Sequence, residues 1–88
     1  MVVNKKMLTL VQRILTKAIE ISSTSASKIF VDYSGHVNYI SIKGYKQGWN
    51  EDEPDYREDI WFNIYSEEQC TRQLETALEY LNKISEGK

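Results

Sequence analysis

The central part of the chain alternates aliphatic side chains with polar or aromatic ones in three segments, and this alternation most constrains the fold. The segments are residues 28–33, 37–45 and 58–65, and the glycine-containing stretch 34–36 predicts a hairpin loop between the first two. Successive side chains of a β-strand point to opposite faces, so each segment predicts a strand with one apolar face. The in-phase aliphatic positions predict the buried face: Ile29, Val31, Ile40, Ile42, Ile60, Phe62 and Ile64.

A helix is predicted on either side of the strands. Residues 4–22 repeat apolar side chains at three- and four-residue spacing, with Asn4 as the N-cap. Residues 66–85 do the same, and Ser66 followed by Gln69 is a capping box. The first stripe comprises Met7, Val11, Ile14, Ala18 and Ile21, widened by Leu8, Leu15 and Ile19. The second comprises Cys70, Leu74, Ala77, Leu78, Leu81 and Ile84.

These patterns predict a single α+β domain over residues 1–88. Its order is α-β-β-β-α, with a three-stranded antiparallel sheet and both helices packed on one face. The 88 residues include one cysteine, so no intramolecular disulfide or thiolate zinc cluster is expected. No apolar run is long enough for a signal peptide or a membrane span. The expected location is therefore the cytoplasm, and no membrane partner is expected.

The residue types that most often carry catalysis do not form a recognisable arrangement. His36 falls in the hairpin loop, where a turn role is favoured over a catalytic one. Cys70 falls on the apolar side of the second helix, where burial is favoured over reactivity, although a helix N-terminus can lower a thiol pKa. The acids and Asn50 of the 50–58 stretch lack the glycine and spacing of the helix–loop–helix calcium motif. We expect no enzymatic activity, no cofactor and no metal site.

The order helix, three strands, helix resembles that of double-stranded-RNA-binding domains. The resemblance implies a shared topology, and such domains hold phosphates with lysines at the start of the second helix. Here that helix begins Ser66-Glu67-Glu68-Gln69, which is acidic where the lysines are required. Direct nucleic-acid binding is therefore not expected.

The face of the sheet opposite the aliphatic one is predicted to be uncovered and rich in aromatic side chains. Exposed tyrosine and tryptophan are typical of protein interfaces, so this face predicts a small protein-interaction module, most simply a two-fold homodimer. Two alternatives stay open: one helix covers this face, or its aromatics stack on bases beside Lys43. The expected partner-binding residues are Tyr39, Tyr45, Trp61 and Tyr65.

A strongly acidic stretch lies between the second and third strands and continues into the third. It surrounds Arg57, is bracketed by Trp49 and Tyr56, and contains Pro54. Its favoured interpretation is a solvated connection that discourages strand pairing with other chains. The alternative is a mimic of nucleic-acid phosphates that docks in a basic site of a partner, as phage or mobile-element inhibitors do as a class. The acids are Glu51, Asp52, Glu53, Asp55, Glu58 and Asp59.

Overall fold

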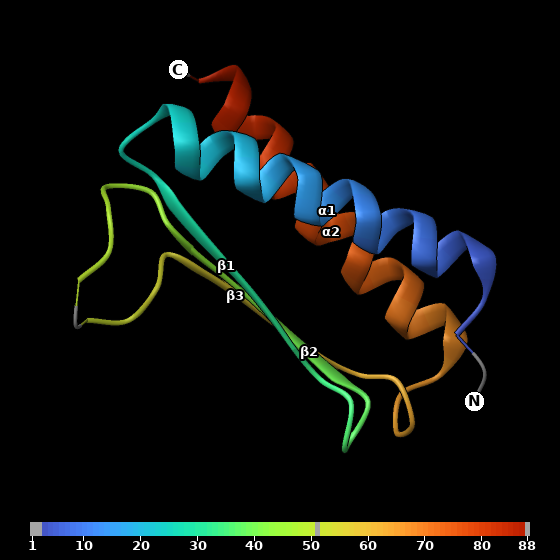
Figure 1. Ribbon diagram of the computed structural model, residues 1–88. Helices are drawn as coiled ribbons and strands as arrows, with labels where there is room; N and C mark the ends of the chain where they lie inside the picture. The colour runs from blue at the N-terminus through green and yellow to red at the C-terminus, as the bar shows by residue number, and fades with distance from the viewer. Residues whose placement is uncertain (1–2, 51, 88) are drawn as a thin grey trace.

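The chain folds into a layer of two helices over a layer of three strands (Figure 1). The computed structural model describes residues 3–50 and 52–87. Both helices lie on the same side of the sheet, so the predicted α+β order and layering are confirmed (Figure 1). The elements are α1 (Lys5–Thr24), β1 (Lys28–Ser34), β2 (Tyr39–Tyr45), β3 (Tyr56–Trp61) and α2 (Glu67–Glu86).

The sheet is antiparallel and its strands follow in chain order, β1-β2-β3. Val31 of β1 lies opposite Ile42 of β2, and Ile40 lies opposite Ile60 of β3. This register places the aliphatic positions of all three strands on one face, because side chains alternate along each strand. That face meets the helices, and Ile42 and Ile60 are fully buried.

The core lies between that sheet face and the facing sides of both helices. Each helix begins at its predicted cap: Asn4 Oδ1 accepts a hydrogen bond from the Met7 amide (2.9 Å), and Ser66 Oγ accepts one from the Gln69 amide (3.1 Å). Asn4 Nδ2 also donates to Glu67 Oε1 (2.7 Å), which ties the two helix starts together. The buried cluster is Met7, Leu10, Ile14, Ala18, Ile21, Ile40, Ile42, Ile60, Phe62, Cys70, Leu74, Ala77, Leu78 and Leu81.

The third strand ends four residues earlier than predicted. The amides of Ile64 and Tyr65 both donate to the Trp61 carbonyl (3.1 and 2.9 Å), so the chain turns directly after Trp61 instead of extending to residue 65. Phe62 remains in the core, but the side chain of Ile64 is 73% exposed. Placing Ile64 on the buried face was therefore wrong, because the alternation stops where the chain reverses toward α2.

The apolar stripe of α1 is wider than the surface that covers it. Leu10 is buried, whereas Leu8, Leu15 and Ile19 are 52%, 46% and 59% exposed. These three were expected to widen the core stripe and instead remain at its margin. None of the described helices is long and apolar enough to cross a membrane.

Candidate functional site

Three rows of side chains cross all three strands on the face of the sheet turned away from the helices. Strand pairing sets Asp32, Ser41 and Asp59 side by side in an acidic row. The next row, toward the C-terminal end of β2, contains one aromatic and two basic side chains: Phe30, Lys43 and Arg57. The row on the other side joins Ser34, Tyr39 and Trp61. We call the side chains of these three rows the open face.

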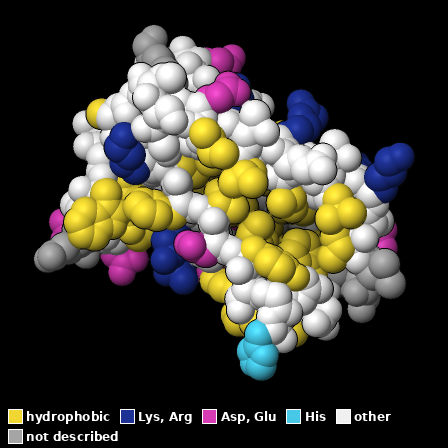
Figure 2. Space-filling view, in the orientation of Figure 1, with side chains coloured by type: hydrophobic (Ala, Val, Ile, Leu, Met, Phe, Trp, Pro, Cys, Tyr) yellow, Lys and Arg dark blue, Asp and Glu magenta, His cyan; other side chains and the backbone are white. Residues whose placement is uncertain are grey.

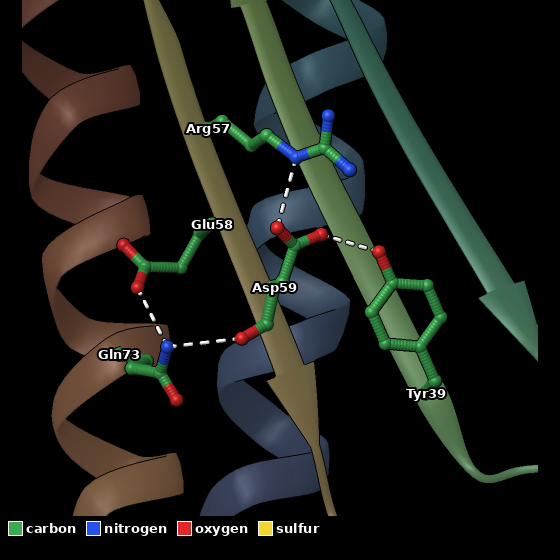
Figure 3. Close-up of polar contacts among 5 residues, drawn as sticks. All are labelled: Tyr39, Arg57, Glu58, Asp59 and Gln73. Atoms are coloured by element: carbon green, nitrogen blue, oxygen red, sulfur yellow. Dashed lines mark hydrogen bonds and ion pairs between the residues drawn. The ribbon is translucent and has the colours of Figure 1, made fainter.

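Asp59 is the most constrained side chain of the open face. Its two carboxylate oxygens accept from different donors: Oδ1 from the Tyr39 hydroxyl, and Oδ2 from Arg57 Nε at 2.8 Å (Figure 3). Arg57 and Asp59 are two residues apart on β3, and Tyr39 reaches across from β2. Sequence reasoning missed Arg57 as a partner of Asp59, although their two-residue spacing on a strand places them on one face.

The electrostatics of this cluster favour the ionised carboxylate. Partial burial by itself would raise the pKa of Asp59, but hydrogen bonds from Arg57 and Tyr39 hold that pKa below its ordinary value. The hydrogen bond with Asp59 in turn raises the pKa of the Arg57 guanidinium. A charged and positioned carboxylate therefore lies on the open face near neutral pH.

The hydroxyl of Ser41 lies in the middle of the acidic row and has an unusual environment. Ser41 is only 5% exposed, and its Oγ finds no hydrogen-bond partner among the described residues. A buried polar group without a partner costs about 1–3 kcal/mol. The centre of the open face thus holds a polar atom that the described part of the chain leaves unsatisfied.

The four aromatics predicted to form one exposed patch do not share one environment. Tyr39 and Trp61 stack on each other, with centroids 4.1 Å apart and planes 28° apart, and both are half-buried. Tyr45 is only 8% exposed and makes an edge contact with Phe30, so its predicted exposure was wrong. Tyr65 follows the turn after β3 and packs against the core, so its placement on the strand was also wrong. Of the four, Tyr39 and Trp61 occupy the positions expected of them.

A second polar cluster lies between β3 and α2 and was not anticipated. Gln73 Nε2 donates to Glu58 Oε1 (2.8 Å) and to the Asp59 carbonyl (3.0 Å), as Figure 3 shows. The Tyr56 hydroxyl donates to the other oxygen of Glu58 (2.6 Å), and the Tyr56 ring stacks on Tyr80 at 4.1 Å. These contacts fasten the outer edge of β3 to α2.

The acidic stretch is divided among several structural roles. Asp55 Oδ2 accepts from the Lys46 amide (2.6 Å), and the Asp55 amide donates to the Gly44 carbonyl (2.9 Å), which closes the base of the loop. Glu58 faces α2 and Asp59 faces the open side, as described above.

Asp55 is exposed although its side chain supports the loop. Asp52 and Glu53 are exposed, and Glu51 lies outside the described residues. Of the two aromatics that bracket the acids, Tyr56 is fixed by its stack on Tyr80, whereas Trp49 is 60% exposed. The loop is anchored at its base, and its exposed described carboxylates are those of Asp52, Glu53 and Asp55.

The two residues considered for catalysis lie in different environments. Cys70 is fully buried, and burial raises the pKa of its thiol. His36 is exposed in the β1–β2 turn. Within residues 3–50 and 52–87, no three histidine, cysteine or acidic side chains gather in a way that could hold a metal ion.

Compared with known proteins, the chain matches no protein-family model, no curated protein and no solved structure. Its function is therefore inferred from its own side chains.

Proposed function

We propose that the chain is a small non-enzymatic protein-interaction module of the cytoplasm that binds a partner protein over its open face and acts as a homodimer. The observation that carries the proposal is a set of side chains held in fixed positions on the face of the sheet that neither helix covers. Asp59 is held by two donors, and Tyr39 and Trp61 are stacked beside it. Side chains held in place before binding lose little entropy on binding, which favours recognition.

The chemistry of the open face favours a protein partner over a nucleic acid. Asp32 and Asp59 would repel phosphates, and the cation nearest to Asp59, Arg57, is already engaged with it. Lys43 lies in the row beside these acids. Mixed charges beside stacked aromatic rings are typical of the polar rim and aromatic centre of protein interfaces.

The proposal is tested by exchanging two charges on the open face. The double variant Asp32→Lys/Lys43→Asp keeps the net charge and leaves the Tyr39–Trp61 stack untouched. The matched control is Lys6→Glu/Glu75→Lys, which exchanges an exposed ion pair between the helices (3.5 Å). Each protein is immobilised, and proteins captured from lysate of the source cells are quantified.

We expect the parent and the helix-layer control to capture the same proteins. The open-face exchange should reduce that capture at least about tenfold while keeping the circular dichroism spectrum, because misplaced charges at an interface are costly. Equal capture by all three proteins would overturn the assignment of the open face. Capture no greater than that of an unrelated carrier protein would overturn the proposed class.

A further inference from the structure

Large apolar side chains are exposed along the seam between α1 and β1. Leu8, Val11, Leu15 and Ile19 recur along one side of α1 at three- and four-residue steps. Together with the adjoining residues of β1 they line two hollows of about 400 and 370 Å³ that follow each other along the seam. Figure 2 shows hydrophobic side chains gathered in this hollowed region between the helix layer and the sheet. The β1 residues that line the hollows are Ile29, Phe30, Val31, Asp32 and Tyr33.

The same seam runs along an open strand edge. The Ile29 amide donates to Ser22 Oγ (2.9 Å), so the backbone groups of Ile29 point away from β2. Backbone direction alternates along a strand, so the N–H and C=O groups of Val31 and Tyr33 point outward as well. Because β1 is the first strand of the sheet, no described strand pairs with them.

The opposite edge of the sheet is closed by comparison. On β3 the Asp59 carbonyl accepts from Gln73 of α2 (3.0 Å), and the Trp61 carbonyl accepts from the amides of Ile64 and Tyr65. An unprotected edge strand is a template for pairing with another chain, and natural proteins normally protect such edges. An open edge flanked by exposed leucine and isoleucine therefore indicates a binding surface.

We propose that this seam binds a second copy of the chain, with the two β1 strands paired antiparallel about a two-fold axis at Val31. In this register the N–H and C=O groups of Val31 bond to those of Val31 in the second copy. The Tyr33 amide bonds to the Ile29 carbonyl of the second copy. Residues of such a pair exchange both bonds, so the Tyr33 carbonyl of the second copy takes the place of Ser22 Oγ at the Ile29 amide. Pairing therefore replaces this one bond and otherwise uses groups that β1 leaves free.

Charge complementarity supports a second copy as the occupant. With the axis at Val31, residues whose numbers add to 62 are paired, so Asp32 lies opposite Phe30 of the second copy. The nearest cation to Asp32 across the axis is then Lys43 of the second copy, one strand beyond Phe30, whereas Arg57 stays paired with Asp59 of its own copy. The two-fold axis repeats this attraction between Asp32 of one copy and Lys43 of the other.

The apolar side chains are also arranged for a two-fold contact. Val31 meets its own counterpart, and the exposed side of α1 faces the same side of α1 in the second copy. The helices run antiparallel there, which brings Leu8 of one copy toward Ile19 of the other. The result is a six-stranded sheet with four helices on one face, and the two open faces become continuous on the other.

The proposal is tested by the double variant Leu15→Glu/Ile19→Glu. Both side chains are about half exposed in the monomer, so the fold should be retained. The matched control is Trp49→Glu, which places a charge at an exposed large apolar residue (60%) that lines neither hollow. Sedimentation velocity between about 1 and 500 µM gives the dimer dissociation constant. Amide exchange at low and high concentration reports on the edge of β1.

We expect the parent and Trp49→Glu to dimerise, with the Val31 and Tyr33 amides protected only at high concentration. The seam variant should raise the dissociation constant at least about 100-fold, as loss of a central interface anchor does. A parent that stays monomeric at 500 µM would overturn the proposal. So would a dimer that tolerates the seam variant, or one that forms without protecting these two amides.

This inference rests on the homodimer named in the proposed function, but it is independent of the partner bound by the open face. A monomeric seam variant should still capture that partner, although it presents one open face in place of two. Conversely, the Asp32→Lys/Lys43→Asp exchange preserves the attraction between positions 32 and 43 across the axis and should still dimerise. If the seam proposal is wrong, the sedimentation result fails; if the open-face proposal is wrong, the capture result fails.

Discussion

Tyr80 of α2 lies directly against Gly44 of β2. A Cβ atom built on Gly44 would lie 2.7 Å from both Cε2 and Oη of Tyr80. The Tyr80 ring has little room to withdraw, because its other face stacks on Tyr56 with planes 13° apart. Glycine at position 44 thus lets α2 approach the end of the sheet, where its tyrosine closes the core.

Replacing Gly44 with alanine should destabilise the fold by about 1–3 kcal/mol, the usual cost of overpacking a well-filled core. Chemical denaturation followed by circular dichroism measures the change. Gly35→Ala is the control, because a Cβ there meets only Tyr33, at an ordinary 3.5 Å. If Gly44→Ala and Gly35→Ala unfold at the same denaturant concentration, the tyrosine does not hold its position against Gly44.

The hydroxyl of Tyr80 should be dispensable at neutral pH. It is buried without a hydrogen-bond partner among the described residues, so Tyr80→Phe removes an unsatisfied group and should change stability by about 0 to +1 kcal/mol. Burial and the charge of Asp55 raise the pKa of Tyr80. The folded state therefore holds this proton more tightly than the unfolded state, and stability falls as pH rises above about 10. Melting at pH 7 and pH 11 should show a smaller alkaline loss for Tyr80→Phe than for the parent. An equal loss would mean that the Tyr80 hydroxyl does not cause the loss of stability at alkaline pH.

The order of elements and the buried sheet face could be predicted because both depend on local periodicity. Alternation in β2 and β3 identified Ile40, Ile42 and Ile60 correctly, and cap residues identified both helix starts. The end of β3 could not be predicted in this way. Ile64 continues the alternation, but the place where α2 returns to the sheet decides where the strand stops.

The open face was predicted in outline but not in detail, because its contacts depend on strand register. The burial of Tyr45 comes with its contact to Phe30 of the neighbouring strand, and the position of Asp59 comes from Tyr39. Neither pairing is visible before the strands are aligned. The exposed side of α1 was misjudged for a similar reason: the width of an apolar stripe does not reveal how much of it the sheet can cover.

The buried face of the sheet is tested by a pair of isoleucines. Ile42 is fully buried and Ile64 is 73% exposed, although both fit the same sequence pattern. Ile42→Ala should cost roughly 2–5 kcal/mol, whereas Ile64→Ala should cost about 0.5 kcal/mol or less. Thermal and chemical unfolding of the two variants compare them directly. Similar losses for both would mean that the residues after Trp61 pack more tightly than the turn allows.

The Tyr39–Asp59–Arg57 cluster should give stability a specific dependence on acid. Since the pKa of Asp59 is lowered in the folded state, its contribution to the free energy of unfolding is fully present above the pKa of about 4 that it has in the unfolded chain. It is lost as pH falls through the folded pKa. Asp59→Asn should therefore be less stable than the parent at pH 7, and the difference should shrink toward pH 2. Asp32→Asn removes an exposed carboxylate from the same row without touching the cluster. A difference that shrinks equally for Asp32→Asn would contradict this origin.

The acidic loop provides the last prediction, which separates a solvated connection from a phosphate mimic. Asp52 and Glu53 are exposed, whereas Asp55 supports the loop through the Lys46 amide, so the sharpest neutral variant is Asp52→Asn/Glu53→Gln. Folding should be unchanged, since exposed charges contribute little to stability. As a solvated connection, the neutral variant should capture the same partner proteins as the parent at about 50 and 500 mM salt. A mimic would instead lose its partner on neutralisation and bind with a steep salt dependence, because screening weakens exposed charge pairs. Parallel capture at both salt concentrations decides between them, and a neutral variant that loses a salt-sensitive partner would contradict our expectation.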